Sequence, residues 1–334
     1  MDVIKETQDI PCMTGITLIN PSNRDPLRAA DGGLLDLAAN FFPLKNGAYR
    51  MVSEPNYTTS FGFQWNKFVK TQIDQARKMS RQSADRLFTV TGWDRQDLEG
   101  QQILEVGSGA GRFTQVILAH TRANLYSVDY SQAVEANYKN NGPDDRLHLF
   151  QASVYEMPFA PAQFDKVFCF GVIQHTPDVA KTVKSLIEMA KPGGEVIVDF
   201  YCVRGWWTKI HAKYLFRPIT RRWSNEKLLR RIERNIDWMI RVTTFFNRIG
   251  IGKICNRFIP VCDIKNTMPP DLGPAELREW CILDTFDMFS PRYDQPQKVE
   301  TVRQWFIDNR MKDVWGGEIP LASGKAHVVR GIKS

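Results

Sequence analysis

Short apolar runs alternate with helical segments between residues 102 and 201, and this alternation is the strongest constraint on the fold. The helical segments are 113–120, 132–140 and 179–190. Such spacing predicts βαβ units, and hence a parallel α/β sheet with helices on both faces. The runs that fit buried strands are 103–106, 125–128, 147–150, 166–170 and 196–201.

Three glycines stand where the first predicted strand turns into the first helix: Gly107, Gly109 and Gly111. Glycine there permits a tight turn and lets the backbone approach a ligand closely. Asp129 ends the next strand, 22 residues after Gly107. A carboxylate at that offset can bind both ribose hydroxyls of a cofactor.

The chemistry around this turn favours a nucleoside cofactor without phosphates. The glycine spacing is Gly-x-Gly-x-Gly, whereas a pyrophosphate site has Gly-x-Gly-x-x-Gly; residues 112 and 113 are Arg and Phe. Glu105, just before the turn, would repel a pyrophosphate but tolerate a sulfonium and an ammonium. These features disfavour NAD.

The same residues carry a family resemblance. Residues 104–113, Leu-Glu-Val-Gly-Ser-Gly-Ala-Gly-Arg-Phe, resemble the first motif of class I methyltransferases that depend on S-adenosylmethionine. Residues 128–131, 164–178 and 191–194 are similar to three later motifs, in the same order. The resemblance implies a seven-stranded Rossmann-like sheet with helices on both faces, and S-adenosylmethionine as the cofactor, converted to S-adenosylhomocysteine without a metal.

The likeness is strongest to the small-molecule branch that includes ubiquinone and menaquinone methyltransferases. It extends to a bacterial subgroup in which a zinc-ribbon-like module precedes Ser-Phe-Gly-x-Gln-Trp-Asn; residues 42–47, 60–66 and 283–294 match its pattern. Only Cys12 remains of the subgroup's N-terminal cysteines, so no zinc site is expected. Ser153 replaces the acidic residue usual after the third strand, which weakens the inferred grip on the adenine amine.

The resemblance also assigns residues to the cofactor site. Tyr57, Phe61, Gln64 and Trp65 could close over the cofactor, or could belong to a helix that only packs on the sheet. The other predicted cofactor residues are Glu105, Gly107, Ser108, Gly109, Arg112, Asp129, Tyr130, Ser131, Ala152, Ser153, Val154 and Gly171.

Methyl transfer is an in-line displacement that mainly requires alignment and exclusion of water, and a base only for some acceptors. His175, after the fourth strand, is the candidate base, with a structural role as the alternative. Asp178 is expected to cap the helix that starts at Val179. A substrate pocket is predicted from a polar and aromatic set that could equally form a turn network: Gln174, Trp280, Asp284, Asp287 and Tyr293.

Positive charge is concentrated in one segment. Residues 204–257 hold fourteen Lys or Arg against three acids, a balance of +11, whereas the whole chain carries +7. We predict an irregular lead-in (1–55), a cofactor-binding core (56–203), a basic helical cap inserted at 204–275, and the end of the core with the last helix and two strands (276–334). The cap could be a solvated face, a patch for an anionic or carrier-bound substrate, or a peripheral membrane contact, since aromatic and basic residues interleave over 206–223.

Two enzyme functions follow from these observations. The first is methylation of oxygen, nitrogen or carbon in a small molecule. The second is methylation of RNA through the basic cap, which the sequence pI of about 9.0 encourages. Residues 170–173 read Phe-Gly-Val-Ile rather than the Asp/Asn-Pro-Pro-Tyr/Phe of amine-modifying nucleic-acid enzymes, so the first function is favoured and nucleic acid is the less expected partner. A polar N-terminus, scattered cysteines and the lack of a long apolar run predict a cytoplasmic protein.

Overall fold

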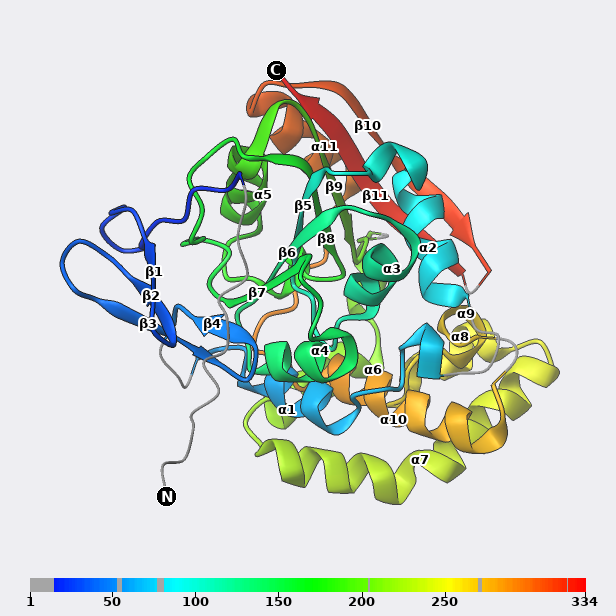
Figure 1. Ribbon diagram of the computed structural model, residues 1–334. Helices are drawn as coiled ribbons and strands as arrows, with labels where there is room; N and C mark the ends of the chain where they lie inside the picture. Colours follow the sequence, from blue (N-terminus) through cyan, green and yellow to red (C-terminus); the bar gives the residue numbers. More distant parts are fainter. Residues whose placement is uncertain (1–14, 53–55, 77–80, 204, 270–271, 323) are drawn as a thin grey trace, which may run out of the picture.

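A single mixed sheet of eleven strands organises the computed structural model, which describes residues 15–334 apart from 53–55, 77–80, 204, 270–271 and 323 (Figure 1). The strand order is β1-β2-β3-β4-β7-β6-β5-β8-β9-β11-β10. The strands are β1 (Arg28–Ala30), β2 (Gly33–Leu35), β3 (Phe41–Lys45), β4 (Ala48–Arg50), β5 (Gln102–Val106), β6 (Asn124–Asp129), β7 (Leu147–Gln151), β8 (Phe164–Phe170), β9 (Ala190–Phe200), β10 (Met311–Leu321) and β11 (Gly324–Lys333).

The centre of this sheet is parallel, as the alternating pattern predicts. Strands β7, β6, β5, β8 and β9 run parallel in that order, and β11 then pairs antiparallel with β9 and with β10. Parallel neighbours bring their carboxyl ends to one edge, so the glycine turn after β5, Asp129 at the end of β6 and the loop after β8 meet there. β9 is longer than predicted because it begins at Ala190 and takes in the Lys-Pro-Gly-Gly turn, where the register with β8 shifts.

The N-terminal segment corrects the predicted strand count. Seven strands and an irregular lead-in are expected, but the sheet contains eleven strands, because β1 to β4 extend it beyond β7. β4 pairs in parallel with β7, Tyr49 opposite Phe150. The four strands have three to five residues each and include turn formers such as Pro43, so they are too short to show a two-residue period. Cys12, the only N-terminal cysteine that remains of the subgroup's zinc-ribbon-like module, lies outside the described residues.

Helices cover both faces of the sheet. α2, α3 and α4 pack on the face that carries Ile103 and Leu125. α5 and α11 pack on the face that carries Leu104 and Tyr126. The helices are α1 (Thr59–Lys67), α2 (Gln82–Thr91), α3 (Arg112–His120), α4 (Ala133–Asn141), α5 (Val179–Met189), α6 (Ala212–Thr220), α7 (Asn225–Arg248), α8 (Gly252–Cys255), α9 (Ile264–Thr267), α10 (Pro274–Phe289) and α11 (Val299–Asp308).

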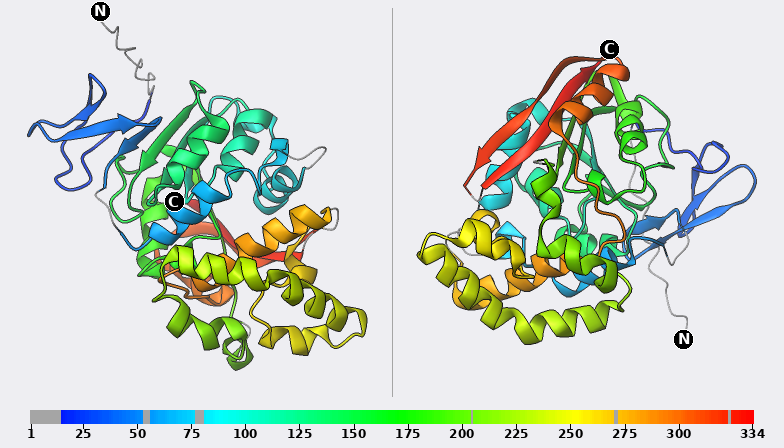
Figure 2. Two further views of the ribbon diagram at one scale, coloured as in Figure 1. Left: turned by 90° about the horizontal axis from the view of Figure 1, so that it is seen from below. Right: turned by 180° about the vertical axis from the view of Figure 1, so that it is seen from behind.

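The predicted basic insertion is helical, and its apolar cluster continues into α10. Leu229 and Ile236 of α7 belong to the same buried cluster as Trp280 and Phe286 of α10. The cap helices therefore run from α6 to α10, past the predicted boundary at 275. Figure 2 shows α7 along the outside of the molecule in both further views. None of the helices in the described part of the chain is long and apolar enough to cross a membrane.

Candidate functional site

A cavity of about 920 Å³ lies where the carboxyl ends of the central strands meet α1 and the cap helices. Its wall combines the glycine turn after β5, the end of β6, the loop after β8, and side chains of α1, α6 and α10. In open α/β sheets this edge is the usual place for a ligand. The cavity is therefore the candidate active site.

The glycine turn forms one wall of this cavity, and its backbone requires glycine. Gly107 has φ +84°, and a Cβ there would lie 2.3 Å from the side chain of Val172. Gly109 has φ +53°, and a Cβ there would lie only 3.0 Å from the indole nitrogen of Trp65. Both residues line the cavity together with Ser108. The turn thus brings its backbone to the ligand space, as the glycine pattern predicts.

Asp129 is fixed beside this turn. Its Oδ2 accepts a hydrogen bond from the Gly109 amide at 2.9 Å, and its Oδ1 accepts bonds from the Ser131 amide and hydroxyl at 2.8 and 2.7 Å. Burial raises the pKa of the Asp129 carboxyl. Asp129 and Tyr130 line the cavity, but Ser131 is buried behind the carboxylate and orients it.

Glu105 lies away from the cavity, contrary to its predicted contact with the cofactor. Its side chain is 2% exposed and accepts hydrogen bonds from the hydroxyls of Thr114 at 2.5 Å and Ser127 at 2.9 Å. Burial raises the pKa of Glu105 to about 7. The residue joins β5, β6 and α3 through these bonds, because side chains alternate along a strand and this one points away from the cavity.

Arg112 lines the cavity at the start of α3. Its Nε donates to the Ser83 hydroxyl at 2.8 Å, and a terminal nitrogen donates to the side chain of Gln72 at 3.4 Å. Burial lowers the pKa of Arg112 to about 10, so the side chain remains a cation at neutral pH. A buried cation at this point suits the carboxylate of an amino-acid moiety.

The four predicted residues of the aromatic helix segment all line the cavity: Tyr57, Phe61, Gln64 and Trp65. The ring of Tyr57 lies 5.2 Å from that of Tyr130, and the ring of Phe61 lies 5.2 Å from that of His175. Gln64 is 1% exposed, and among the described residues its amide nitrogen and oxygen have no hydrogen-bond partner. Buried polar groups are normally bonded, so this amide indicates a polar ligand in the cavity.

The segment after β7 contributes two of its three predicted residues. Ala152 and Val154 line the cavity, whereas Ser153 does not. The Ser153 hydroxyl instead accepts a hydrogen bond from the Tyr155 amide at 3.2 Å. The cavity wall is therefore apolar at these positions.

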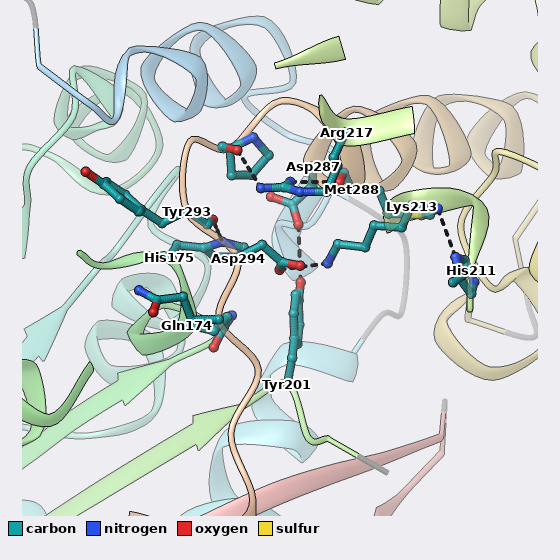
Figure 3. A network of polar contacts seen from close by, with 12 residues as sticks. Gln174, His175, Tyr201, His211, Lys213, Arg217, Asp287, Met288, Tyr293 and Asp294 are labelled. Atoms are coloured by element: carbon teal, nitrogen blue, oxygen red, sulfur yellow. Dashed lines mark hydrogen bonds and ion pairs between the residues drawn. The ribbon is translucent and has the colours of Figure 1, made fainter. Parts of the chain in front are cut away.

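His175 sits at the centre of a polar network beside the cavity (Figure 3). Its Nδ1 lies 3.0 Å from the carbonyl oxygen of Tyr293, and in the described part of the chain its Nε2 has no partner. A carbonyl only accepts, so Nδ1 carries the proton and Nε2 carries the lone pair. Burial lowers the pKa of His175, which keeps the ring neutral near pH 7. These are the properties of a base.

The predicted substrate residues divide into two groups. Trp280, Asp284 and Asp287 line the cavity from α10. Gln174 and Tyr293 do not: the amide of Gln174 donates to the Gly171 carbonyl at 2.6 Å, and the ring of Tyr293 packs against that of Tyr57 at 5.4 Å.

Asp284 and Asp287 differ in environment. Burial and the neighbouring Asp287 raise the pKa of Asp284 to about 8, so its carboxyl is largely protonated at neutral pH. Asp287 accepts a hydrogen bond from the hydroxyl of Tyr201 at 3.2 Å. The charge of Asp287 raises the pKa of that hydroxyl well above its usual range.

Several cavity residues are absent from the sequence-based prediction. Tyr201 and Lys213 line the cavity, and Lys213 pairs with Asp294 at 2.8 Å. Arg86 of α2 also lines it and forms an ion pair with Asp199 of β9. Tyr201 is the last residue of the fifth predicted strand (196–201), so the rule that ligands bind at carboxyl ends could have identified it. Lys213 and Arg86 come from helices, and only the three-dimensional packing brings them here.

No group of three or more His, Cys, Asp or Glu side chains that could hold a metal ion occurs among the residues described. The five cysteines in that part of the chain are free thiols. The cavity is lined instead by backbone amides, carboxyls, side-chain amides, the cationic groups of Arg and Lys, and the imidazoles of His175, His211 and His327.

Known proteins share the central part of this chain. Residues 104–198 match the protein-family model described as a methyltransferase domain. The chain is 31% identical over 121 residues to a tRNA U34 carboxymethyltransferase of Pseudoalteromonas atlantica, an alignment that covers 34% of this chain and 37% of that protein. It is 34% identical over 109 residues to a ubiquinone biosynthesis O-methyltransferase of Azoarcus sp., covering 30% of this chain and 43% of that protein. The chain thus spans less than half the length of these curated relatives.

Among solved structures, the magnesium protoporphyrin IX methyltransferase ChlM of Synechocystis PCC 6803 with bound SAH overlaps with 83% of this chain and 97% of its own, at 13% identity and a TM-score of 0.43. The family match, by contrast, covers the glycine turn, Asp129 and His175, the residues that meet at the cavity. Residues 104–198 are therefore similar to a methyltransferase domain.

Proposed function

We propose that this chain transfers a methyl group from S-adenosylmethionine to oxygen, nitrogen or carbon of a small-molecule acceptor. The observation that carries the proposal is the carboxylate of Asp129, bonded to the Gly109 amide, in the wall of a cavity of about 920 Å³. Small-ligand sites range from roughly 300 to 1,000 Å³, so this volume has room for a cofactor and a second small molecule.

The cavity residues fit the proposed cofactor by their chemistry. Asp129 would accept hydrogen bonds from the ribose hydroxyls, and Tyr130, Ala152 and Val154 would border the adenine. Arg112 would pair with the carboxylate of the methionine part. When bound, S-adenosylmethionine supplies an electrophilic methyl group on a sulfonium.

His175 is the base that we propose for acceptors that must lose a proton. Its Nε2 would take the proton from the acceptor, while Nδ1–H bonded to the Tyr293 carbonyl fixes the tautomer. The ring of Tyr201 packs edge-on at 5.6 Å and helps to hold the imidazole in place. The rings of Phe61 and Tyr201 on either side limit access of water to this nitrogen.

The cations in the cavity wall favour an anionic acceptor in this proposal. Lys253 and Arg257 line the cavity together with His211 and Asp263. Burial and the positive charges of Arg257 and Lys213 lower the pKa of His211 to about 4. A positive potential in this wall would favour a carboxylate or a phosphate. A screen with labelled S-adenosylmethionine and carboxylated or phosphorylated metabolites tests this acceptor class.

An RNA acceptor is the second candidate function. It is favoured by the similarity to tRNA U34 carboxymethyltransferases and by the basic cap. An RNA base would have to leave its stack to reach a cavity enclosed by α1 and α10. Salt-dependent RNA retention on a filter, lost when cap arginines are reversed in charge, would favour this function over the first.

Calorimetry of cofactor binding tests the proposal. The wild-type chain should bind S-adenosylmethionine, and Asp129→Asn should weaken binding by about 10- to 100-fold, because hydrogen bonds to a charged group contribute about 1.5–3 kcal/mol each. Asp165→Asn, the same change on a carboxylate that pairs with Lys191 outside the cavity, is the matched control. No heat of binding at about 1 mM cofactor would refute the proposed function.

A further inference from the structure

The long helix α7 has two chemically different faces. Its inner face is apolar and buried in the cap cluster with α10, and includes Leu229, Ile232 and Ile236. Its outer face is exposed and turns away from the rest of the molecule, as Figures 1 and 2 show. We name this surface the α7 outer face; it consists of Lys227, Arg230, Arg231, Arg234, Trp238, Arg241, Phe245, Arg248 and Ile249.

These nine residues lie on one narrow stripe. At 3.6 residues per turn they occupy about a third of the helix circumference. Large apolar side chains project from the stripe and from its end, where Ile249 follows the last residue of α7: Trp238 is 46% exposed, Phe245 56% and Ile249 51%. The arginines lie among and beside them. A solvated helix face would normally carry polar residues at these central positions.

The arginines of the α7 outer face remain available to bind an external partner. Two of the three acids of α7 pair with residues of other helices: Glu233 pairs with Lys67 at 3.5 Å, and Asp237 pairs with Arg278 at 2.9 Å. The third, Glu226, lies exposed in the first turn of α7. Within the described residues, none of the five outer arginines forms an ion pair. The face is therefore strongly cationic as well as apolar.

We propose that the α7 outer face docks on an anionic lipid surface. A helix that lies in a membrane interface combines Lys and Arg with Trp and Phe, which enter the boundary between headgroups and acyl chains. Each Lys or Arg near an anionic leaflet contributes attraction, and the aromatic rings prefer the headgroup level. Charge complementarity favours anionic lipid, and the exposed aliphatic Ile249 suits acyl chains better than nucleic-acid phosphates.

The docking surface continues into the wall of the cavity. The chain leaves α7 at Arg248 and reaches Lys253 and Arg257, which line the cavity. Between them lies Ile254, 62% exposed, and next follows Phe258, 52% exposed. An acceptor delivered from the lipid surface would meet this end of the cavity first. Docking itself does not depend on the proposed methyl transfer.

Vesicle co-sedimentation of the full chain tests the proposal. Vesicles of phosphatidylcholine alone are compared with vesicles in which about one third is phosphatidylglycerol, at about 0.1 M salt. The chain should sediment with the anionic vesicles and not with the neutral ones. Replacing three outer arginines, Arg231→Glu, Arg234→Glu and Arg241→Glu together, should weaken binding by about 100-fold. Trp238→Ser with Phe245→Ser should weaken it by about tenfold.

A matched control separates this face from general charge. Lys139→Glu, Lys298→Glu and Lys312→Glu change three exposed residues on other elements by the same total charge, and should leave vesicle binding unchanged. Circular dichroism checks that every variant folds. Equal loss in the control triple, or equal sedimentation with neutral and anionic vesicles, would overturn the proposal. So would retention of tRNA that depends on the three arginines in a chain that does not bind vesicles.

Discussion

At the scale of single residues, His175 has an Nε2 without a partner among the described residues and an Nδ1 held by the carbonyl oxygen of Tyr293. His175→Asn keeps a donor that can bond to the Tyr293 carbonyl but removes the base. We expect turnover to fall by about 100-fold or more with cofactor affinity retained, because general base catalysis contributes at least that much. Retention of wild-type turnover in this variant would show that the imidazole has only a structural role.

The pH profile gives an independent readout of His175. Its pKa is lowered by burial, and a base must be neutral to act. The wild-type rate should therefore fall only on the acidic side. The fall should come below pH 6.5, the ordinary histidine pKa, because burial lowers the pKa of His175. The pH profile of any residual activity in His175→Asn should lack this fall on the acidic side.

Glu105 predicts a pH-dependent stability. Its pKa is about 7 in the folded chain, above the ordinary value of 4.5 for a glutamate side chain. The folded state therefore binds the proton more tightly, so the stabilisation is present below about pH 4.5 and is lost as pH rises through about 7. Glu105→Gln should stabilise the protein at pH 8 by about 2–3 kcal/mol. Urea unfolding of both proteins at pH 5 and pH 8 measures this effect. The prediction would be contradicted if the free energy of unfolding of Glu105→Gln differed from that of the wild type by the same amount at both pH values.

Residue types at motif positions were easier to predict than side-chain directions. The glycine turn, Asp129 and Arg112 could be placed from spacing because the turn and the strand ends fix them. Glu105 was misplaced because a one-residue change along a strand turns a side chain to the opposite face. Ser153 and Tyr293 do not line the cavity but contact residues that flank it, Tyr155 and Tyr57 respectively. Sequence spacing carries no signal for such contacts.

At the scale of elements, helix α5 begins as the sequence predicts. Asp178 is its N-cap and accepts a hydrogen bond from the Lys181 amide at 2.9 Å. Asp178→Ala should destabilise the protein by about 1 kcal/mol, while Asp178→Asn, which can also cap, should cost less than half of that. The shift of the urea midpoint measures both. Equal losses in the two variants would mean that capping is not the contribution of Asp178.

Helices α3, α4 and α5 were predicted to within one residue at each end, since their apolar periods are long enough to read. The strands β1 to β4 were missed because three to five residues do not establish a period. Helix α10 was assigned to the core because its apolar residues are spread around it. Only the packing of Trp280 and Phe286 against α7 shows that it belongs with the cap.

At the scale of the whole molecule, the sheet order and the cavity follow from the parallel α/β pattern. The cap could be located from its charge, but its contribution to the cavity could not, since Lys213, Lys253 and Asp284 reach the site from separate helices. The domain match at 104–198 covers the glycine turn, Asp129 and His175, whereas Lys213, Lys253 and Asp284 of the cavity wall lie outside it.

The parallel pairing of β4 with β7 has a consequence for assembly. An unpaired edge strand offers its amides and carbonyls to another chain. Here β4 occupies the edge of β7, and the sheet continues to the three-residue strand β1. At the other end, β10 carries the register shift between Lys312 and Trp315 and contains Pro320, both of which discourage further strand addition. Two copies of this chain should therefore not join by extending one sheet across β7.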